Sequence, residues 1–325
     1  MFNFRDRKSN ATVRQLRPLM EIVATHEHLP LKEENWAERW CTLPKDFEKV
    51  FEQIHNFKVR DDDVFVVTFI KCGTTWTQET AWLLMNQLNY KRAKAEEILH
   101  RSIFLDFTGV FKELDNSIEM CDQQQSPRLI KTHLPVNLLP KQLWQKKQKV
   151  IYVARNIKDV VVSSYHFLKG LGVWTGNMDE FVQDFMNNDI MYAPYLEHLV
   201  DFWKLRHEPN ICFITYEEMK RNLASVIAKL CTFLERPQLT ELELQETLEH
   251  LSFNKMRDNK RTNLTYMIKE VAPTDVDKNF QFMRRGIVGS YKDEMTEQHQ
   301  RTLGEWARAF FAKHGIKEED IFGKV

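Results

Sequence analysis

Three short apolar runs stand out along the chain, and each is continuous rather than alternating between apolar and polar positions. They are VFVVTFI (64–70), KVIYVAR (149–155) and NICFITY (210–216), all rich in β-branched or aromatic residues. Such runs are typical of strands that are buried on both faces of a parallel sheet. A shorter run, RLIKTHLP (128–135), is a fourth candidate strand.

Helical patterns follow the three main runs. They are TTWTQETAWLLMNQL (74–88), IKDVVVSSYHFLKG (157–170) and YEEMKRNLASVIAKLCTFL (216–234). Strands that alternate with helices predict an α/β fold, with a central, mostly parallel sheet flanked by helices. No internal repeat or linker is visible, so we expect a single domain over residues 26–325, preceded by a loose N-terminal extension, residues 1–25.

Charge and cysteine usage narrow the class of protein. Forty-six basic residues balance forty-six acidic ones, so no global field favours nucleic acid, and any anion site must be local. The five cysteines are widely spaced and form no C-x-x-C pair, which favours a reducing compartment without structural zinc. The N-terminus has no apolar signal segment, and the apolar runs are too short to span a bilayer. We therefore expect a cytoplasmic protein with no nucleic-acid or membrane partner.

The carboxyl ends of parallel strands meet at one edge of a sheet, and ligands of such folds bind there. The first strand end carries KCGTTW (71–76). Gly73 would let the backbone approach an anion, and a helix starting near Thr74 would offer free N–H groups beside the charge of Lys71. Because the lysine precedes the glycine, this is not a Walker loop, and a threonine-capped helix with a solvated lysine explains the stretch equally well.

Two further strand ends and one loop also carry basic residues. Lys131 and His133 are two apart in an extended segment and so face the same side, where histidine suits proton transfer and lysine suits an oxyanion. Arg155 directly follows the second main run, with Ser163 about two helical turns further on. The segment FMRRGIVGSYK (282–292) combines two arginines with two glycines. A surface arginine with a solvated serine, and a charged surface turn, are alternatives for the last two features. A lone histidine bonded to a backbone carbonyl is the alternative for the first, but the lysine partner and the strand end count against it. Together the features indicate a ligand with more than one anionic group.

Four of these segments, TFIKCGTTW, RLIKTHLP, VIYVARNIKDVVVSSYHF and FMRRGIVGSYK, resemble the ordered motifs of the cytosolic sulfotransferases. The resemblance extends from about Asn56 to Thr296. It implies a P-loop-like loop that binds phosphosulfate, and transfer of a sulfuryl group from 3′-phosphoadenosine 5′-phosphosulfate (PAPS) to a hydroxyl or amine. The product of the donor would be 3′-phosphoadenosine 5′-phosphate (PAP), and no metal would be needed.

The resemblance also implies a role for each matched residue. His133 would deprotonate the acceptor, Lys131 would bind sulfate oxygens, and Lys71 would stabilise charge on the leaving phosphate. The nucleotide would be held by Lys71, Cys72, Gly73, Thr74 and Thr75 in the loop, by Trp76, Tyr216, Phe253 and Met256 near the adenine, and by Arg155, Ser163, Phe282, Arg284, Arg285 and Gly286 at or beside the 3′-phosphate. The acceptor pocket would be lined or gated by Phe104, Phe107, Phe167 and Trp174.

The chain departs from the family pattern at several positions. Phe69 and Ile70 replace the usual Tyr-Pro, and Leu251 occupies a position near the adenine that is often a hydroxyl residue. The family's short dimerisation motif is degraded, with Lys292, Thr296, Glu297 and Arg301 at its positions. A monomer and a homodimer therefore both stay open.

Two other functions fit the residues less well. A small-molecule kinase would need the Walker glycine that is missing here. A non-catalytic protein that binds PAPS or PAP would have no use for Lys71, Lys131 and His133 together. The sequence does not select one acceptor among phenols, steroids, retinoids and other small lipophilic alcohols. It also leaves open whether a sulfated product is released or eliminated further.

Overall fold

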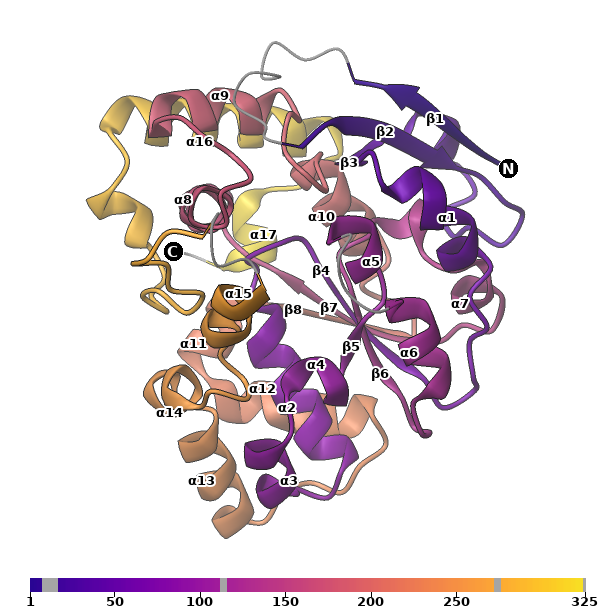
Figure 1. Cartoon of the computed structure of the whole chain (residues 1–325), viewed down its shortest axis with the longest axis vertical. Helices are drawn as coiled ribbons and strands as arrows, with labels where there is room; N and C mark the ends of the chain where they lie inside the picture. The colour runs from indigo at the N-terminus through magenta and orange to yellow at the C-terminus, as the bar shows by residue number, and fades with distance from the viewer. Residues whose placement is uncertain (8–16, 112–115, 272–275, 324–325) are drawn as a thin grey trace.

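The computed structural model describes residues 1–7, 17–111, 116–271 and 276–323, which contain two sheets (Figure 1). The strands are β1 (Phe2–Asp6), β2 (Leu19–Ala24), β3 (Cys41–Pro44), β4 (Val64–Thr68), β5 (Ile103–Phe104), β6 (Leu129–Thr132), β7 (Lys149–Ala154) and β8 (Ile211–Thr215). The main sheet has five parallel strands in the order β5-β6-β4-β7-β8. The smaller sheet is antiparallel, in the order β1-β2-β3.

Helices cover both faces of the main sheet (Figure 1). Packed on one face are α2 (Thr74–Met85) and α12 (Leu223–Phe233), and on the other α8 (Ile157–Gly170) and α10 (Tyr195–Lys204). The other helices and turns are α1 (Phe47–His55), α3 (Tyr90–Ala95), α4 (Ile98–Arg101), α5 (Phe107–Val110), α6 (Ser117–Gln123), α7 (Lys141–Gln145), α9 (Met178–Met186), α11 (Tyr216–Arg221), α13 (Glu241–His250), α14 (Phe253–Asp258), α15 (Thr265–Val271), α16 (Glu297–Lys313), α17 (Glu318–Phe322), η2 (Trp36–Glu38), η3 (Val136–Leu138) and η4 (Ser290–Asp293). Across the described residues, none of the helices combines the length and the apolar character needed to cross a membrane.

The continuous apolar runs form strands that are buried on both faces, as predicted. In β4, Phe65 and Val67 join the core cluster that includes α8 and α10, whereas Val64 and Val66 join the cluster that includes α2 and α12. Since successive side chains of a strand point to opposite faces, a strand between two helical layers needs apolar residues at every position. The predicted α/β fold with a parallel sheet is confirmed.

The elements end close to their predicted limits, with two informative differences. The first strand ends at Thr68 rather than at Ile70, because residues 69–73 form the loop before α2. The predicted helix over 216–234 is split into α11 and α12, because the side chain of Asn222 accepts a hydrogen bond from the main chain of Ser225 and begins a new helix.

The described part of residues 1–25 belongs to the smaller sheet, although we expected a loose extension. Phe2 pairs with Ala24 across β1 and β2, and Leu19 pairs with Pro44 across β2 and β3. Alternate residues of β2, such as Ile22, are buried in the main core, so this strand is held by packing as well as by pairing. Residues 8–16 lie outside the described residues, and a domain boundary at residue 26 stays a prediction.

A buried ion pair joins the segments that lead into β4 and β6. The guanidinium of Arg128 donates to both carboxylate oxygens of Asp63, at 2.7 and 2.6 Å, and neither side chain is exposed. The variant Asp63→Ala would leave the guanidinium buried without its counter-charge, so we expect it to lower the free energy of unfolding by about 3–5 kcal/mol. Chemical denaturation measures this loss, with the exposed neighbour Asp62→Ala as the control. A loss below about 1 kcal/mol would mean that Asp122, 3.4 Å from Arg128, compensates the charge.

Candidate active site

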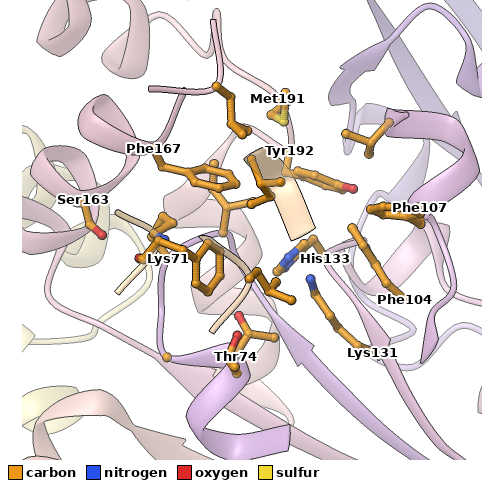
Figure 2. Close-up of a pocket in the computed structure, with 18 of the residues that line it drawn as sticks. Lys71, Thr74, Phe104, Phe107, Lys131, His133, Ser163, Phe167, Met191 and Tyr192 are labelled. Carbon is orange, nitrogen blue, oxygen red and sulfur yellow. The ribbon is translucent and has the colours of Figure 1, made fainter. Parts of the chain in front are cut away.

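A large cavity of about 1300 Å³ opens at the carboxyl edge of the main sheet. Its lining includes Lys71 after β4, His133 after β6, Arg155 after β7 and Tyr216 after β8. Figure 2 shows Lys131 and His133 near the centre, with Phe104 and Phe107 toward one side and Lys71 and Phe167 toward the other. The fold therefore brings the four predicted strand ends to one cavity.

The loop after β4 has an unusual backbone. Both Lys71, with φ of +63°, and Gly73, with φ of +102°, are in the left-handed region, which glycine adopts readily and lysine does not. A Cβ atom at Gly73 would also lie 2.9 Å from Cδ2 of Tyr216. Nη1 of Arg155 donates to the carbonyl of Lys71 at 3.0 Å and so stabilises the turn. The loop ends at Thr74, where the free N–H groups of the first turn of α2 lie at the cavity lining.

Two aromatic rings enclose the ammonium group of Lys71. Its Nζ lies 3.9 Å from the ring centroid of Phe282 and 4.4 Å from that of Phe167, and it donates to the carbonyl of Phe282 at 3.2 Å. Burial, together with the charge of Arg155 and other nearby cations, lowers the pKa of Lys71 from 10.5 to about 7. A lysine in this state gains its full charge when an anion binds beside it.

Hydrogen bonding fixes the tautomer of His133. Its Nδ1 lies 2.7 Å from the main-chain carbonyl of Thr68, which can only accept, so Nδ1 carries the proton and Nε2 carries the lone pair. The hydroxyl of Thr68 is 2.7 Å from the hydroxyl of Thr74, which ties this histidine to the start of α2. Burial, and then the charge of Lys131, lower the pKa of His133 well below 6.5, so the ring is neutral and can accept a proton.

Lys131 lies beside His133 and against an aromatic ring. Its Nζ is 3.7 Å from the ring centroid of Phe104, and burial lowers its pKa from 10.5 to about 8. The buried carboxylate of Asp106 opposes this shift, and it accepts hydrogen bonds from the main chain of His133 at 3.3 Å and from the hydroxyl of Tyr192 at 2.6 Å. Asp106 was missed in the sequence because β5 has only two residues and gives no strand pattern.

The same cavity contains aromatic and basic side chains suited to a nucleotide. The rings of Trp76 and Tyr216 meet edge to face with centroids 5.8 Å apart, and the guanidinium of Arg155 lies 4.3 Å from the ring of Tyr216. Nε1 of Trp76 and Nε of Arg155 are buried without a hydrogen-bond partner in the described part of the chain. Unpaired buried donors beside a cavity indicate a polar ligand. The other predicted residues that line the cavity are Thr75, Ser163, Phe253, Met256, Arg284, Arg285 and Gly286.

Arg284 and Arg285 are paired with acidic side chains. Nη1 of Arg284 lies 2.6 Å from Glu294, and Nη2 of Arg285 lies 2.5 Å from Asp293. These carboxylates orient the guanidinium groups but also compete for them. A phosphate in the cavity would therefore share both arginines with their present partners.

Two predicted residues do not line the cavity. Trp174 is 1% exposed, because its ring packs on Phe181 and its Nε1 donates to Asp184 at 3.0 Å, so it belongs to the core. Cys72 is fully buried, with its Sγ 3.7 Å from the carbonyl of Ile70, and its side chain does not reach the cavity.

The cavity lining near His133 is largely apolar. The predicted residues Phe104, Phe107 and Phe167 are part of it, and the ring of Phe104 is 5.1 Å from that of His133. Several other residues of the cavity lining could not be found from the sequence, because they lie on short helices or loops away from the strand ends. These are Leu99, Phe111, Met191, Tyr192, Leu264, Met267 and Ile268.

Comparison with known proteins identifies the family of this chain. The sequence model described as a sulfotransferase domain matches residues 61–315. The chain belongs to the sulfotransferase family. It is 37% identical over 248 residues to sulfotransferase 1 family member D1 of Mus musculus, covering 76% of this chain and 82% of the relative. It is also 36% identical over 301 residues to luciferin sulfotransferase of Photinus pyralis, covering 88% of this chain and 81% of the relative.

Two solved structures with bound PAP have the same fold as this chain. A retinol dehydratase in complex with androsterone and the inactive cofactor PAP superposes with a TM-score of 0.85 at 24% identity, over 98% of both chains. A mouse sulfotransferase complexed with PAP gives 0.67 at 23% identity, over 86% of this chain and 93% of that one. The predicted PAPS-dependent sulfotransferase is confirmed, whereas the acceptor and the roles of individual residues stay predictions.

Proposed function

We propose that this sulfotransferase transfers the sulfuryl group of PAPS to the hydroxyl of a small lipophilic acceptor, with His133 as the general base. The hydrogen bond from Nδ1 of His133 to Thr68 carries the proposal, because it leaves Nε2 free to take the hydroxyl proton. The apolar lining around His133, including Phe104 and Phe107, suits an acceptor of low polarity. The relative from Photinus pyralis is named for luciferin.

The lysines of the site would stabilise negative charge during transfer of the sulfuryl group. The acceptor oxygen bonds to sulfur while the bond from sulfur to the phosphate oxygen breaks, and His133 removes the acceptor proton. Lys131 would stabilise the sulfuryl oxygens, and Lys71 would stabilise the leaving phosphate oxygen. Trp76 and Tyr216 would hold the adenine while Arg155, Ser163 and the 284–286 loop hold the 3′-phosphate.

A transfer assay with radiolabelled PAPS tests this function. We expect label on at least one member of a panel of phenols, steroids, retinoids, other lipophilic alcohols and amines. The methyl ether of the best acceptor is the matched control and should take no label, because it has no proton to lose. Transfer from labelled ATP, with none from PAPS, would contradict the proposal.

The affinity for PAP should fall as the pH rises above about 7. In the free protein, burial and neighbouring cations lower the pKa of Lys71 to about 7, whereas a bound phosphate favours the ammonium form and raises that pKa. Binding then takes up a proton, so the dissociation constant should rise by up to about tenfold per pH unit above this value. Isothermal titration in buffers of different ionisation enthalpy measures both the affinity and the proton uptake.

The variant Lys71→Arg is the matched control for this pH dependence. A guanidinium stays charged throughout the range, so the dissociation constant of this variant should change much less with pH. Lys131→Arg tests the smaller contribution of Lys131, whose pKa is lowered to about 8. The same pH dependence in the wild-type protein and in Lys71→Arg would rule out Lys71 as its source.

A further inference from the structure

A second cavity, of about 420 Å³, lies outside the active site. Three histidines, His26, His28 and His55, contribute to its lining together with Lys141, and we call these four residues and the space between them the histidine pocket. None of the residues that line it also lines the active-site cavity. It joins the loop after β2 to the end of α1 and the start of α7.

Two imidazoles of the histidine pocket are buried without partners. The ring centroids of His26 and His55 are 5.4 Å apart, and those of His26 and His28 are 6.2 Å apart. Both ring nitrogens of His26 and both of His55 are shielded from solvent and have no hydrogen-bond partner within the described ranges, and His55 is 2% exposed. An unpaired buried polar group costs about 1–3 kcal/mol, so a ligand that formed hydrogen bonds with these nitrogens would be stabilised by removing that cost.

The charges that act on these imidazoles are mostly positive. Lys141 lines the pocket, and the charges of His28, of the amino group of Met1, which donates to the carbonyl of Thr25, and of Lys32 also act on His26. Burial and these cations lower the pKa of His26 to about 4.

The histidine pocket contains little negative charge to offset these cations. Glu27 is the acidic residue among its lining residues, but its side chain is 85% exposed and lies 3.5 Å from His28. Within the described ranges, no three histidine, cysteine or acidic side chains are arranged to hold a metal ion. Excess positive charge disfavours a metal cation and favours an anion.

We propose that the histidine pocket binds a small oxyanion of the phosphate or sulfate type. The imidazole N–H groups of His26 and His55, the ammonium of Lys141 and the amides of Gln142 and Gln145 supply its donors. A tetrahedral oxyanion accepts several hydrogen bonds at once, and its charge offsets the repulsion between Lys141 and a protonated imidazole. Binding therefore favours protonation of the histidines and strengthens as the pH falls. This proposal does not depend on which acceptor the protein uses or on the roles proposed for the active-site residues.

Titration of the full chain with inorganic phosphate, and separately with sulfate, tests the proposal by NMR of isotope-labelled histidine rings. We expect saturable shifts of the His26 and His55 signals, and a rise of their pKa values from about 4 toward the ordinary value of 6.5. Sodium chloride at matched ionic strength is the control for screening and should not produce the saturable shift. Absence of saturation with both oxyanions would overturn the proposal, leaving a pocket that holds water only.

Two variants assign the effect to the pocket. His55→Phe removes both nitrogens yet keeps a ring that can stack on Phe51, whose centroid is 5.5 Å from that of His55, and Lys141→Gln removes one charge. Each should weaken phosphate binding about tenfold or more, whereas the exposed neighbour Lys147→Gln should not. All three should keep the wild-type rate of sulfuryl transfer, so failure here is distinguishable from failure of the proposed function. Unchanged phosphate binding in His55→Phe, or saturable binding of Zn²⁺ in place of the oxyanions, would overturn the proposal.

Discussion

Replacement of His133 by alanine is expected to lower kcat by about 10²–10⁴-fold and to leave the dissociation constant of PAP within about threefold of the wild-type value. Nδ1 of His133 donates to the carbonyl of Thr68 at 2.7 Å, so Nε2 is the nitrogen left to take a proton in the proposed reaction. No other histidine of the described chain lines the active-site cavity, so none can replace it as the base. Steady-state kinetics with the best acceptor, and titration with PAP, measure the two effects.

Acceptors of different acidity separate proton transfer from positioning. An acidic phenol is already largely ionised at neutral pH and needs a base less, so the loss caused by His133→Ala should be smaller for it than for a weakly acidic alcohol. His207→Ala, at an exposed position outside the cavity lining, is the matched control and should keep the wild-type rate. An equal loss for both kinds of acceptor would mean that His133 positions the acceptor and does not take its proton.

The basicity of His133, the proposed base, should depend on whether the donor is bound. Burial and the charges of Lys131 and Lys71 lower the pKa of His133 in the free protein, so its neutral form persists as the pH falls below 6.5. An anionic donor beside the two lysines offsets part of that repulsion and raises the pKa again. Under the proposed mechanism, His133 would therefore be a weak base in the free protein and a stronger one when the donor is in place.

The grouping of the strand-end residues could be predicted from the sequence. Lys71, His133 and Arg155 each follow a buried apolar run closely, and parallel strands of one sheet end at the same edge. The order of the residues along the chain was then enough to place them at one cavity. Their roles, by contrast, came from the resemblance to a family.

The acceptor side could not be predicted in the same way. Asp106 lies on the turn between β5 and α5, two elements too short to show a period, and Met191 lies on the turn between α9 and α10. The places of both residues depend on packing between segments distant in sequence. Trp174 was assigned to the pocket by resemblance, but a hydrogen bond to Asp184 keeps it in the core, and no local pattern shows that pairing. The need for glycine at position 286 is equally non-local, since a Cβ atom there would lie 2.3 Å from the ring of Phe253.

Replacement of Lys71 by alanine is expected to lower kcat by about 10²–10³-fold. The ammonium group is held by the rings of Phe282 and Phe167, at 3.9 and 4.4 Å, and by a carbonyl at 3.2 Å. A charge fixed in this way needs no reorganisation when the leaving phosphate oxygen becomes more negative, so its effect is larger than that of a mobile surface lysine. Single-turnover measurements at saturating PAPS report the loss directly.

Kinetic constants distinguish the two actions of Lys71. An increase in the KM for PAPS with unchanged kcat would mean that Lys71 only binds the donor, whereas a fall in kcat means that it acts in the transition state. Lys169→Ala, at an exposed position outside the cavity lining, is the matched control. Because Lys71 also titrates near pH 7 in the free protein, its alanine variant should lose the pH dependence of PAP affinity together with the rate. The proposal assigns both donor binding and stabilisation of the leaving group to the ammonium of Lys71. If Lys71→Ala lost only the rate, or only the pH dependence of PAP affinity, this double assignment would be wrong.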